Sequence, residues 1–292
     1  MRLVFIGLVF SVLAGSLYWY LTRPDPFASP DVLVVGDSQI SYGAGKVYLE
    51  FFDGLKSRCL KTADATAMPE KLDSWTIGTI GVRSSALHSW VARSEGEKAV
   101  ICEVDKKWGV NAGVYGIGGE PARRYVQIGQ GPNYQFCKAG QSPLETMLAP
   151  GHYQPKLLIM AFLGNAADRW AAGTELARSD VQHAMQQIPA DLPCIFMTTA
   201  PTYSLEINEL RQRAQANIKA AFEHNNSRCS FVEGITPLTR NANTGNSDFF
   251  TKNKLGIVTD LHHPNVKAAR RFFEIKAADI CQAIKYQTRA KS

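Results

Sequence analysis

The chain has 292 residues, of which 45% are hydrophobic, and a formal net charge of +6 at pH 7. This length and composition provide enough apolar side chains for one large core, and no repeat of solenoid length or low-complexity stretch is present. No basic tract with interleaved aromatic residues indicates a nucleic-acid partner. The positive charge is compatible with a surface near anionic lipid or acidic polysaccharide, but ordinary solubility explains a charge of this size at least as well.

The N-terminus differs from the rest of the chain. Residues 3–21 contain no charged side chain, and a helix of about 20 apolar residues spans a bilayer. Tyr18, Trp19 and Tyr20 lie at the far end of this run, and Arg2 precedes it, a pattern that favours export of the following chain. We therefore predict an uncleaved single-pass membrane anchor over residues 1–22, with the body on the periplasmic or extracytoplasmic side. A cleaved signal peptide, and hence a secreted protein, is the alternative.

A short proline-containing linker over residues 23–30 leads into the body, which we assign to residues 31–292. The chain contains an even number of cysteines, six, so an exported body can form disulfide bonds, but their pairing cannot be deduced from sequence. Cys194 lies in an apolar run and is equally compatible with a buried free thiol. No Cys/His spacing typical of zinc ligands occurs, so we expect no metal site and no cofactor.

Strand-like and helix-like segments alternate along the body. In chain order, we predict a strand over 31–36, a helix over 40–60, a strand over 75–80, a helix over 84–93, strands over 156–163 and 192–199, a helix over 205–224, a strand over 230–235 and a helix over 264–285. This alternation indicates an α/β fold with a mainly parallel sheet, whose functional site lies at the carboxyl ends of the strands. Ser38, Gly81, Asn165 and the loop at Asp260 all lie at or near such ends.

Residues 97–151 interrupt this alternation and are rich in glycine and aromatic residues. We predict an insertion of short strands and loops beside the active face. It would serve as a substrate platform or lid, or equally well be a surface loop without such a role.

Two short segments far apart in the chain carry the chemistry. The segment 36–39, Gly-Asp-Ser-Gln, follows the first apolar strand, and the segment 260–264, Asp-Leu-His-His-Pro, precedes the last helix. A serine becomes a nucleophile when a histidine takes its proton and a carboxylate orients that histidine. We assign Ser38 as the nucleophile, His263 as the base and Asp260 as its orienting partner, with Pro264 at the first helical position. Two alternatives remain: Asp260 merely caps the helix beside a surface histidine, or His262 is the base.

The sequence resembles the SGNH (GDSL-type) hydrolase family in four short blocks. Residues 36–39 are similar to the first block, 78–85 to the second, 162–165 to the third and 260–264 to the fifth. This resemblance implies a three-layer α/β/α fold of flavodoxin-like type and an oxyanion hole formed by the N–H groups of Ser38 and Gly81 and the amide of Asn165. It covers the body but not the insertion.

Two positions depart from the family pattern. Asn165 directly follows Gly164, whereas the family usually has one residue between them, so the amide donor is displaced or its loop is shorter. Gln39 replaces an aliphatic residue, a change that we expect to affect packing rather than chemistry. The Gly-x-Ser-x-Gly elbow of ordinary α/β-hydrolases is absent, in agreement with the resemblance.

These features together predict a membrane-anchored serine ester hydrolase that removes O-acyl groups, above all acetyl, from cell-envelope or exported carbohydrate. A lipid esterase or thioesterase, and an O-acetyltransferase of the same fold, are the alternative enzymes. A carbohydrate-binding module that has lost catalysis is the alternative without enzymatic activity. The expected partners are a glycan or small-molecule ester and, through the N-terminal segment, the membrane.

Overall fold

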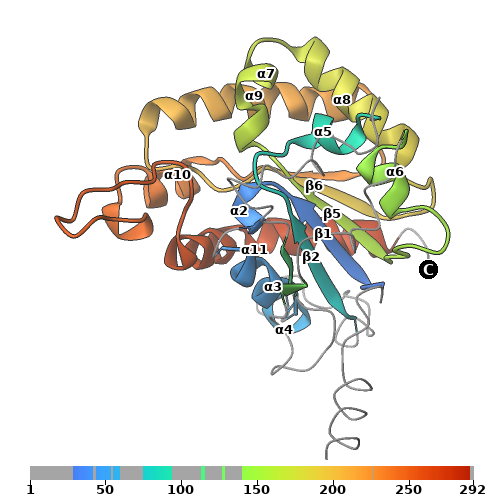
Figure 1. The fold of residues 1–292 in the computed structure, drawn as a ribbon, viewed down its shortest axis with the longest axis horizontal. Coiled ribbons are helices and arrows are strands. Elements are labelled where there is room, and N and C mark those ends of the chain that lie inside the picture. Colours follow the sequence, from blue (N-terminus) through green and yellow to red (C-terminus); the bar gives the residue numbers. More distant parts are fainter. Residues whose placement is uncertain are drawn as a thin grey trace, which may run out of the picture.

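The computed structural model describes residues 29–41, 44–53, 55–59, 75–93, 113–115, 127–128, 140–225 and 227–289. The described strands form one seven-stranded sheet in the order β4-β3-β2-β1-β5-β6-β7, with helices on both faces (Figure 1). The strands are β1 (Val32–Gly36), β2 (Ile77–Gly81), β3 (Gly113–Tyr115), β4 (Gln127–Ile128), β5 (Leu157–Ala161), β6 (Cys194–Met197) and β7 (Ser230–Val232). The predicted three-layer architecture with a mainly parallel sheet is therefore confirmed.

The five strands β2, β1, β5, β6 and β7 are parallel, whereas β3 and β4 add an antiparallel edge. Among the parallel strands, the first in the chain lies between the second and the third, which is the strand order of flavodoxin-like sheets. The next two parallel strands in the chain, β2 and β5, therefore lie on opposite sides of β1. The crevice at the carboxyl end of β1 is where such sheets bind ligands.

Helices cover both faces of the sheet. One face carries α5 (Leu87–Val91), α6 (Pro143–Met147), α7 (Ala167–Ala171), α8 (Thr174–Gln187) and α9 (Leu205–His224). The other carries α3 (Gly45–Asp53), α4 (Leu55–Cys59) and α11 (Val266–Arg289). Short elements at the carboxyl edge are α2 (Ser38–Ser41), the 3-10 turns η5 (Gly164–Ala166) and η6 (Ser247–Phe249), and α10 (Pro237–Asn243).

Two apolar clusters hold the three layers together. Alternate residues of β1 enter opposite clusters, because side chains of a strand point to opposite faces: Leu33 and Val35 face α5–α9, and Val32 and Val34 face α3 and α11. In the second cluster Phe51 of α3 stacks on Phe273 of α11, with ring centroids 4.5 Å apart. Each such buried ring contributes about 1.5–3 kcal/mol of apolar burial. The strand β1, which leads to Ser38, is thus covered on both faces.

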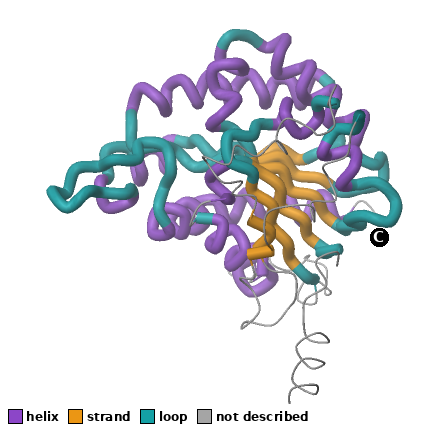
Figure 2. Tube along the Cα trace, viewed as in Figure 1, coloured by secondary structure: helices purple, strands orange, loops and turns teal. Residues whose placement is uncertain are grey.

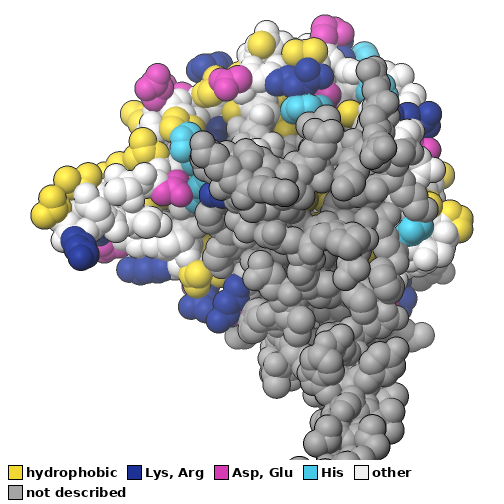
Figure 3. Space-filling view, viewed as in Figure 1, with side chains coloured by type: hydrophobic (Ala, Val, Ile, Leu, Met, Phe, Trp, Pro, Cys, Tyr) yellow, Lys and Arg dark blue, Asp and Glu magenta, His cyan; other side chains and the backbone are white. Residues whose placement is uncertain are grey.

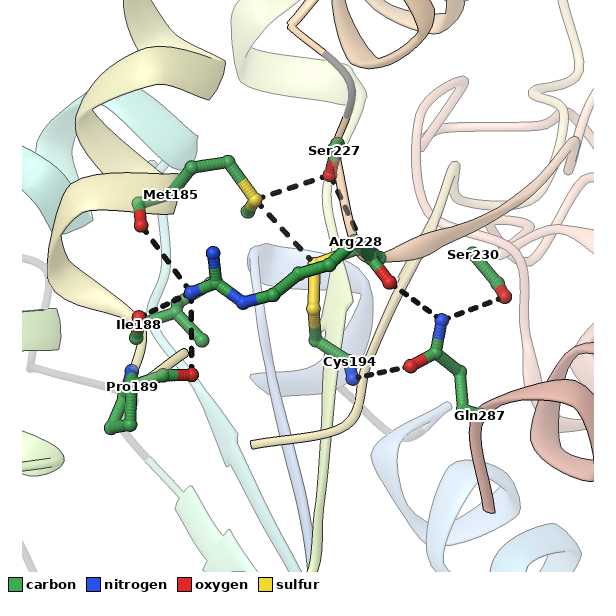
Figure 4. The surroundings of a disulfide bond; sticks show 9 residues. Met185, Ile188, Pro189, Cys194, Ser227, Arg228, Ser230 and Gln287 are labelled. Atoms are coloured by element: carbon green, nitrogen blue, oxygen red, sulfur yellow. Dashed lines mark hydrogen bonds between the residues drawn. A yellow bond between two sulfur atoms is a disulfide. The ribbon is translucent and has the colours of Figure 1, made fainter. Parts of the chain in front are cut away.

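Two disulfide bonds lie within the described residues. Cys59–Cys281 joins α4 to α11, and Cys194–Cys229 joins the start of β6 to the residue before β7. Beside the second bond, Gln287 of α11 accepts a hydrogen bond from the N–H of Cys194 at 3.2 Å and donates to the carbonyl of Arg228 at 2.7 Å (Figure 4). Cys194 is therefore bridged, and its alternative assignment as a free thiol is wrong.

Several predicted boundaries change. The helix predicted over 40–60 is divided into α2, α3 and α4, and the last helix begins at Val266 instead of Pro264. No helix within the described residues combines the length and apolar character needed to cross a bilayer. The predicted anchor at 1–22 and most of the linker and of the 97–151 insertion lie outside the described residues.

Candidate active site

Ser38 lies where the topology predicts a site. Asp37 is the only residue between β1 and α2, so Ser38 is the first residue of that short helix. The N–H groups of a helix's first turn have no acceptor within the helix, and no group in the described part of the chain accepts a hydrogen bond from the N–H of Ser38. This N–H is therefore available to a ligand beside the serine hydroxyl.

The structure brings Ser38, His263 and Asp260 into one hydrogen-bonded chain. His263 Nε2 lies 2.9 Å from Ser38 Oγ although the two residues are 225 positions apart, and His263 Nδ1 lies 2.8 Å from Asp260 Oδ2. Asp260 Oδ1 also accepts the backbone N–H groups of His262 and His263, at 2.9 and 3.0 Å. Burial raises the pKa of Asp260, but these donors and the His263 ring outweigh it, so the pKa lies below its ordinary value. The carboxylate that contacts His263 is thus an anion at neutral pH.

Both alternatives for the 260–264 segment can now be compared with the geometry. The side chain of Asn265, not that of Asp260, accepts an N–H of the first turn of α11, from Ala268 at 3.1 Å. Pro264 lies before the helix rather than at its first position, contrary to the prediction. His262 is exposed, and its neighbour His263 is the residue that contacts Ser38. The carboxylate of Asp260 is directed at the histidine instead of at a helix end.

The predicted oxyanion donors Gly81 and Asn165 have definite places at the carboxyl ends of β2 and β5. Gly81 pairs with Gly36 and Gly113 in the sheet, and a Cβ added to it would lie 2.4 Å from the backbone nitrogen of Ser41. This glycine therefore allows α2 to pack directly on β2. Asn165 Nδ2 donates to the carbonyl of Ser85 at 2.9 Å. An amide nitrogen carries two hydrogens, so one remains for an oxyanion, and both donor roles stay predictions.

The turn after β2 carries a further backbone feature. The N–H of Ser85 donates to the carbonyl of Val82 at 3.2 Å, and Ser84 inside this turn has a φ of 59°. Among the described residues it is the only non-glycine residue with a positive φ. A left-handed serine costs about 1–3 kcal/mol and is often found at functional sites. Sequence reasoning did not single out Ser84, because the turn geometry that isolates it is not visible in the residue pattern.

Sequence reasoning also missed a buried polar cluster beside Ser38, formed around Asp37. Asp37 Oδ1 accepts the N–H of Gln39 at 2.9 Å, and Oδ2 accepts the N–H of Leu163 at 3.4 Å. Burial raises the pKa of Asp37, and the N–H of Gln39 and the charge on Arg211 oppose this rise. Arg211 comes from α9 and is itself buried. Its spacing of three and seven residues from the buried Ala214 and Ile218 was the available signal, since this spacing places it on the buried face of the helix.

A projecting loop lies between η6 and the Asp260–His263 segment. Lys252 and Val258 form an antiparallel bridge at its base, and Gly256 adopts a φ of 78° near its tip. Leu255 and Ile257 are 82% and 59% exposed, and Figure 3 shows hydrophobic side chains at the outer end of this projection. Figure 2 shows that the segment is mostly loop and extends beyond the helical layers. It leads directly into the residues that contact Ser38.

No protein-family model matches the chain, and no curated protein matches it. Among solved structures, a Streptococcus pneumonia protein named for platelet activating factor is 12% identical, with a TM-score of 0.39, over 95% of this chain and 98% of the other. A family two carbohydrate esterase from Clostridium thermocellum, in complex with cellohexaose, is 10% identical, with a TM-score of 0.40, over 89% of this chain and 65% of the other. Similarity at this level does not define an activity.

Proposed function

We propose that the protein is a serine ester hydrolase of the SGNH type that removes O-acyl groups, above all acetyl, from cell-envelope or exported carbohydrate. The hydrogen-bonded chain from Ser38 through His263 to Asp260 carries this proposal. A nucleophile, a base and an orienting carboxylate at the carboxyl end of the central strand are the groups that acyl transfer requires.

The geometry supports a two-step mechanism. His263 Nε2 takes the proton of Ser38 Oγ as the oxygen attacks the ester carbonyl, and Asp260 stabilises the resulting imidazolium. The N–H of Ser38, with Gly81 and Asn165 in their predicted roles, donates to the oxyanion, and each such donor is worth about 2.7–4 kcal/mol. His263 then returns the proton to the departing sugar hydroxyl. Water, activated by the same histidine, hydrolyses the acyl-serine and restores the free enzyme.

Two observations support an exported setting and a substrate outside the bilayer. Disulfides such as Cys59–Cys281 and Cys194–Cys229 are typical of oxidising compartments. The strand β1 begins directly after the predicted linker and ends beside Ser38, so the site lies at the opposite edge of the sheet from the residues that immediately precede β1 (Figure 1). A five-residue strand separates these edges by about 17 Å. If residues 1–22 are an anchor, a site at the edge away from the linker favours an exported glycan ester over a bilayer lipid.

Hydrolysis of short-chain aryl esters by the body, with Ser38→Ala, His263→Ala and His262→Ala compared, tests the proposal. We expect the first two variants to lose activity and the labelling of Ser38 by a serine-directed phosphonate, and His262→Ala to keep both. Equal product release by wild type and Ser38→Ala would refute the catalytic assignment. A wild type that reacts with neither reagent would instead support the inactive binding module.

A further inference from the structure

The residue after the nucleophile is joined by its side chain to a distant loop. Gln39 Nε2 donates to the carbonyl of Ala200 at 3.1 Å, and the N–H of Ala200 donates to Gln39 Oε1 at 3.1 Å. Both residues are buried. A buried amide that pairs both of its polar atoms with one backbone unit fixes the distance and the orientation between the two segments, since losing either partner leaves an unsatisfied polar group. Gln39 therefore joins two segments of the chain in addition to its contribution to packing.

Ala200 belongs to the segment 199–203, which follows β6 and leads to α9. The other end of this segment is hydrogen-bonded to residues 260–263, which carry the proposed base and are called the base loop below. The N–H of Tyr203 donates to the carbonyl of Leu261 at 3.0 Å, two residues before His263. The segment is anchored independently, because Asn243 Nδ2 donates to the carbonyl of Pro201 at 3.2 Å. A continuous path of hydrogen bonds and backbone thus runs from Gln39 to the loop that carries the base.

The backbone of Gln39 is held at the same time, because its N–H donates to Asp37 Oδ1 at 2.9 Å. The carbonyl of Ala200 also accepts Arg211 Nη1 at 3.5 Å, which adds a contact from α9. The first turn of α2 is therefore fixed to the 199–203 segment at a single buried junction. Ser38 Oγ and His263 Nε2 lie on the two sides of this junction, and their 2.9 Å contact depends on the relative position of α2 and the base loop.

We propose that Gln39 is a positioning residue that holds Ser38 in register with His263 through Ala200 and the 199–203 segment. This inference rests on the proposed function, because it concerns the same nucleophile and base. If Ser38 and His263 are held less closely, the protein still binds substrate. The Ser38 hydroxyl then reaches the geometry for attack on the ester carbonyl less often. A misplacement of about 1 Å costs on the order of 10²-fold in rate.

The variant Gln39→Met keeps the length of the side chain and removes both amide bonds. We expect kcat on an aryl ester to fall about 10²-fold with KM almost unchanged, and the rate of phosphonate labelling of Ser38 to fall in parallel. Gln287→Met is the matched control, because Gln287 is also buried and its amide also pairs with backbone groups, but beside the Cys194–Cys229 bond. It should lower the melting temperature without lowering kcat.

A wild-type kcat in folded Gln39→Met, or an equal loss of kcat in Gln287→Met, would overturn the positioning role. Circular dichroism below the melting temperature establishes that each variant is folded. If Gln39→Met does not fold, Gln39→Glu provides the test, since it keeps the acceptor for the N–H of Ala200 and loses the amide donor. Its kcat should lie between those of wild type and Ser38→Ala, and a wild-type value would overturn the inference. Full activity in Ser38→Ala would refute the proposed function instead.

Discussion

Replacing Arg211 by methionine tests whether the polar cluster beside Ser38 holds a charged carboxylate. Arg211 and Asp37 approach Gly164 from the same side: a Cβ added to this glycine would lie 2.6 Å from Arg211 Nη2 and 3.7 Å from Asp37 Oδ2. Burial and the charge on Asp37 both raise the pKa of Tyr48, whose hydroxyl is buried. Arg211 is thus a cation that compensates the charge on Asp37, and a protonated His263 would add to this effect.

The size of the effect follows from two opposing contributions. Burial lowers the pKa of Arg211 from 12.5 to about 10 despite the favourable charge on Asp37. At 1.36 kcal/mol per pH unit, keeping Arg211 charged in the folded state costs about 3 kcal/mol relative to the unfolded chain. This cost is what remains after the attraction to Asp37 is included. Arg211→Met therefore removes the larger desolvation cost of the guanidinium together with its attraction to Asp37, and an uncompensated buried ion costs several kcal/mol. At neutral pH the two contributions partly cancel. The net change in stability at a single pH therefore does not show whether Arg211 and Asp37 are coupled through their charges.

The pH dependence has a definite sign. The folded-state pKa of Asp37 is raised above its ordinary value of 3.8. At pH values between the unfolded-state pKa and the raised folded-state pKa, the folded protein binds more protons than the unfolded chain. Stability therefore falls as pH rises through this interval. Arg211→Met raises the folded-state pKa further and extends the fall to higher pH. Over this added interval the variant should lose up to about 1.4 kcal/mol per pH unit relative to wild type.

Urea unfolding between pH 5 and pH 8 measures this difference for wild type, Arg211→Met, Asp37→Asn and the double variant. We expect the stability of Arg211→Met to decline with pH relative to wild type, and this decline to vanish when Asp37 is also replaced. Arg213→Met removes an exposed arginine from the same helix and should show no such slope. An Arg211→Met effect that is constant across this range in both backgrounds would refute a charge coupling between Arg211 and Asp37.

Three further changes test other parts of the structure. Asp260→Asn should lower kcat about 10⁴-fold, because an amide favours the wrong tautomer of His263; a loss below tenfold in the aryl ester assay would show that another group orients the base. Gly81→Ala places a Cβ 2.4 Å from the backbone nitrogen of Ser41 and should cost about 1–3 kcal/mol in urea unfolding, whereas an unchanged midpoint would mean that α2 moves away freely. The double variant Cys194→Ser/Cys229→Ser should lose about 2–4 kcal/mol of stability under oxidising conditions. Because Cys59–Cys281 remains, added reductant should still lower its melting temperature, but by less than that of wild type.

The elements that could be predicted from sequence are those with a strong local pattern. The helix over 205–224 has the predicted bounds, and the side chain of Ser204 caps it by accepting the N–H of Ile207 at 3.3 Å. In contrast, α8 (Thr174–Gln187) was not predicted, because its buried face consists mainly of small residues and includes Asp180. Such a face gives a weak hydrophobic period. The start of α11 was misplaced since proline and asparagine both favour helix beginnings, and the side chain of Asn265 forms the cap.

The candidate site also contains residues that could be predicted from the sequence and residues that could not. The contact between Asp260 and His263 could be predicted because the two residues are three positions apart, and the serine because it follows a buried strand. Gln39 was expected to contribute packing alone, and its pairing with Ala200 depends on where β6 ends in space. Arg211 is separated from Asp37 by most of the chain, so only the assembled sheet and α9 bring the two charges together. Long-range polar contacts of this kind leave no local pattern in the sequence.

The three consecutive residues 37–39 explain how groups from separate loops remain in register. Asp37 accepts a hydrogen bond from the residue that precedes η5, and Ser38 is hydrogen-bonded to the base loop. Gln39 is hydrogen-bonded to the segment after β6. All three lie at the end of β1, which is paired on both sides and packed on both faces, so this turn follows a well-supported strand. Residues 37–39 therefore help to position these loops, and the loops in turn help to position residues 37–39. Substitutions within 37–39 should consequently change activity and stability together, whereas substitutions at the exposed tip of the projecting loop, at Leu255 or Ile257, touch none of these bonds.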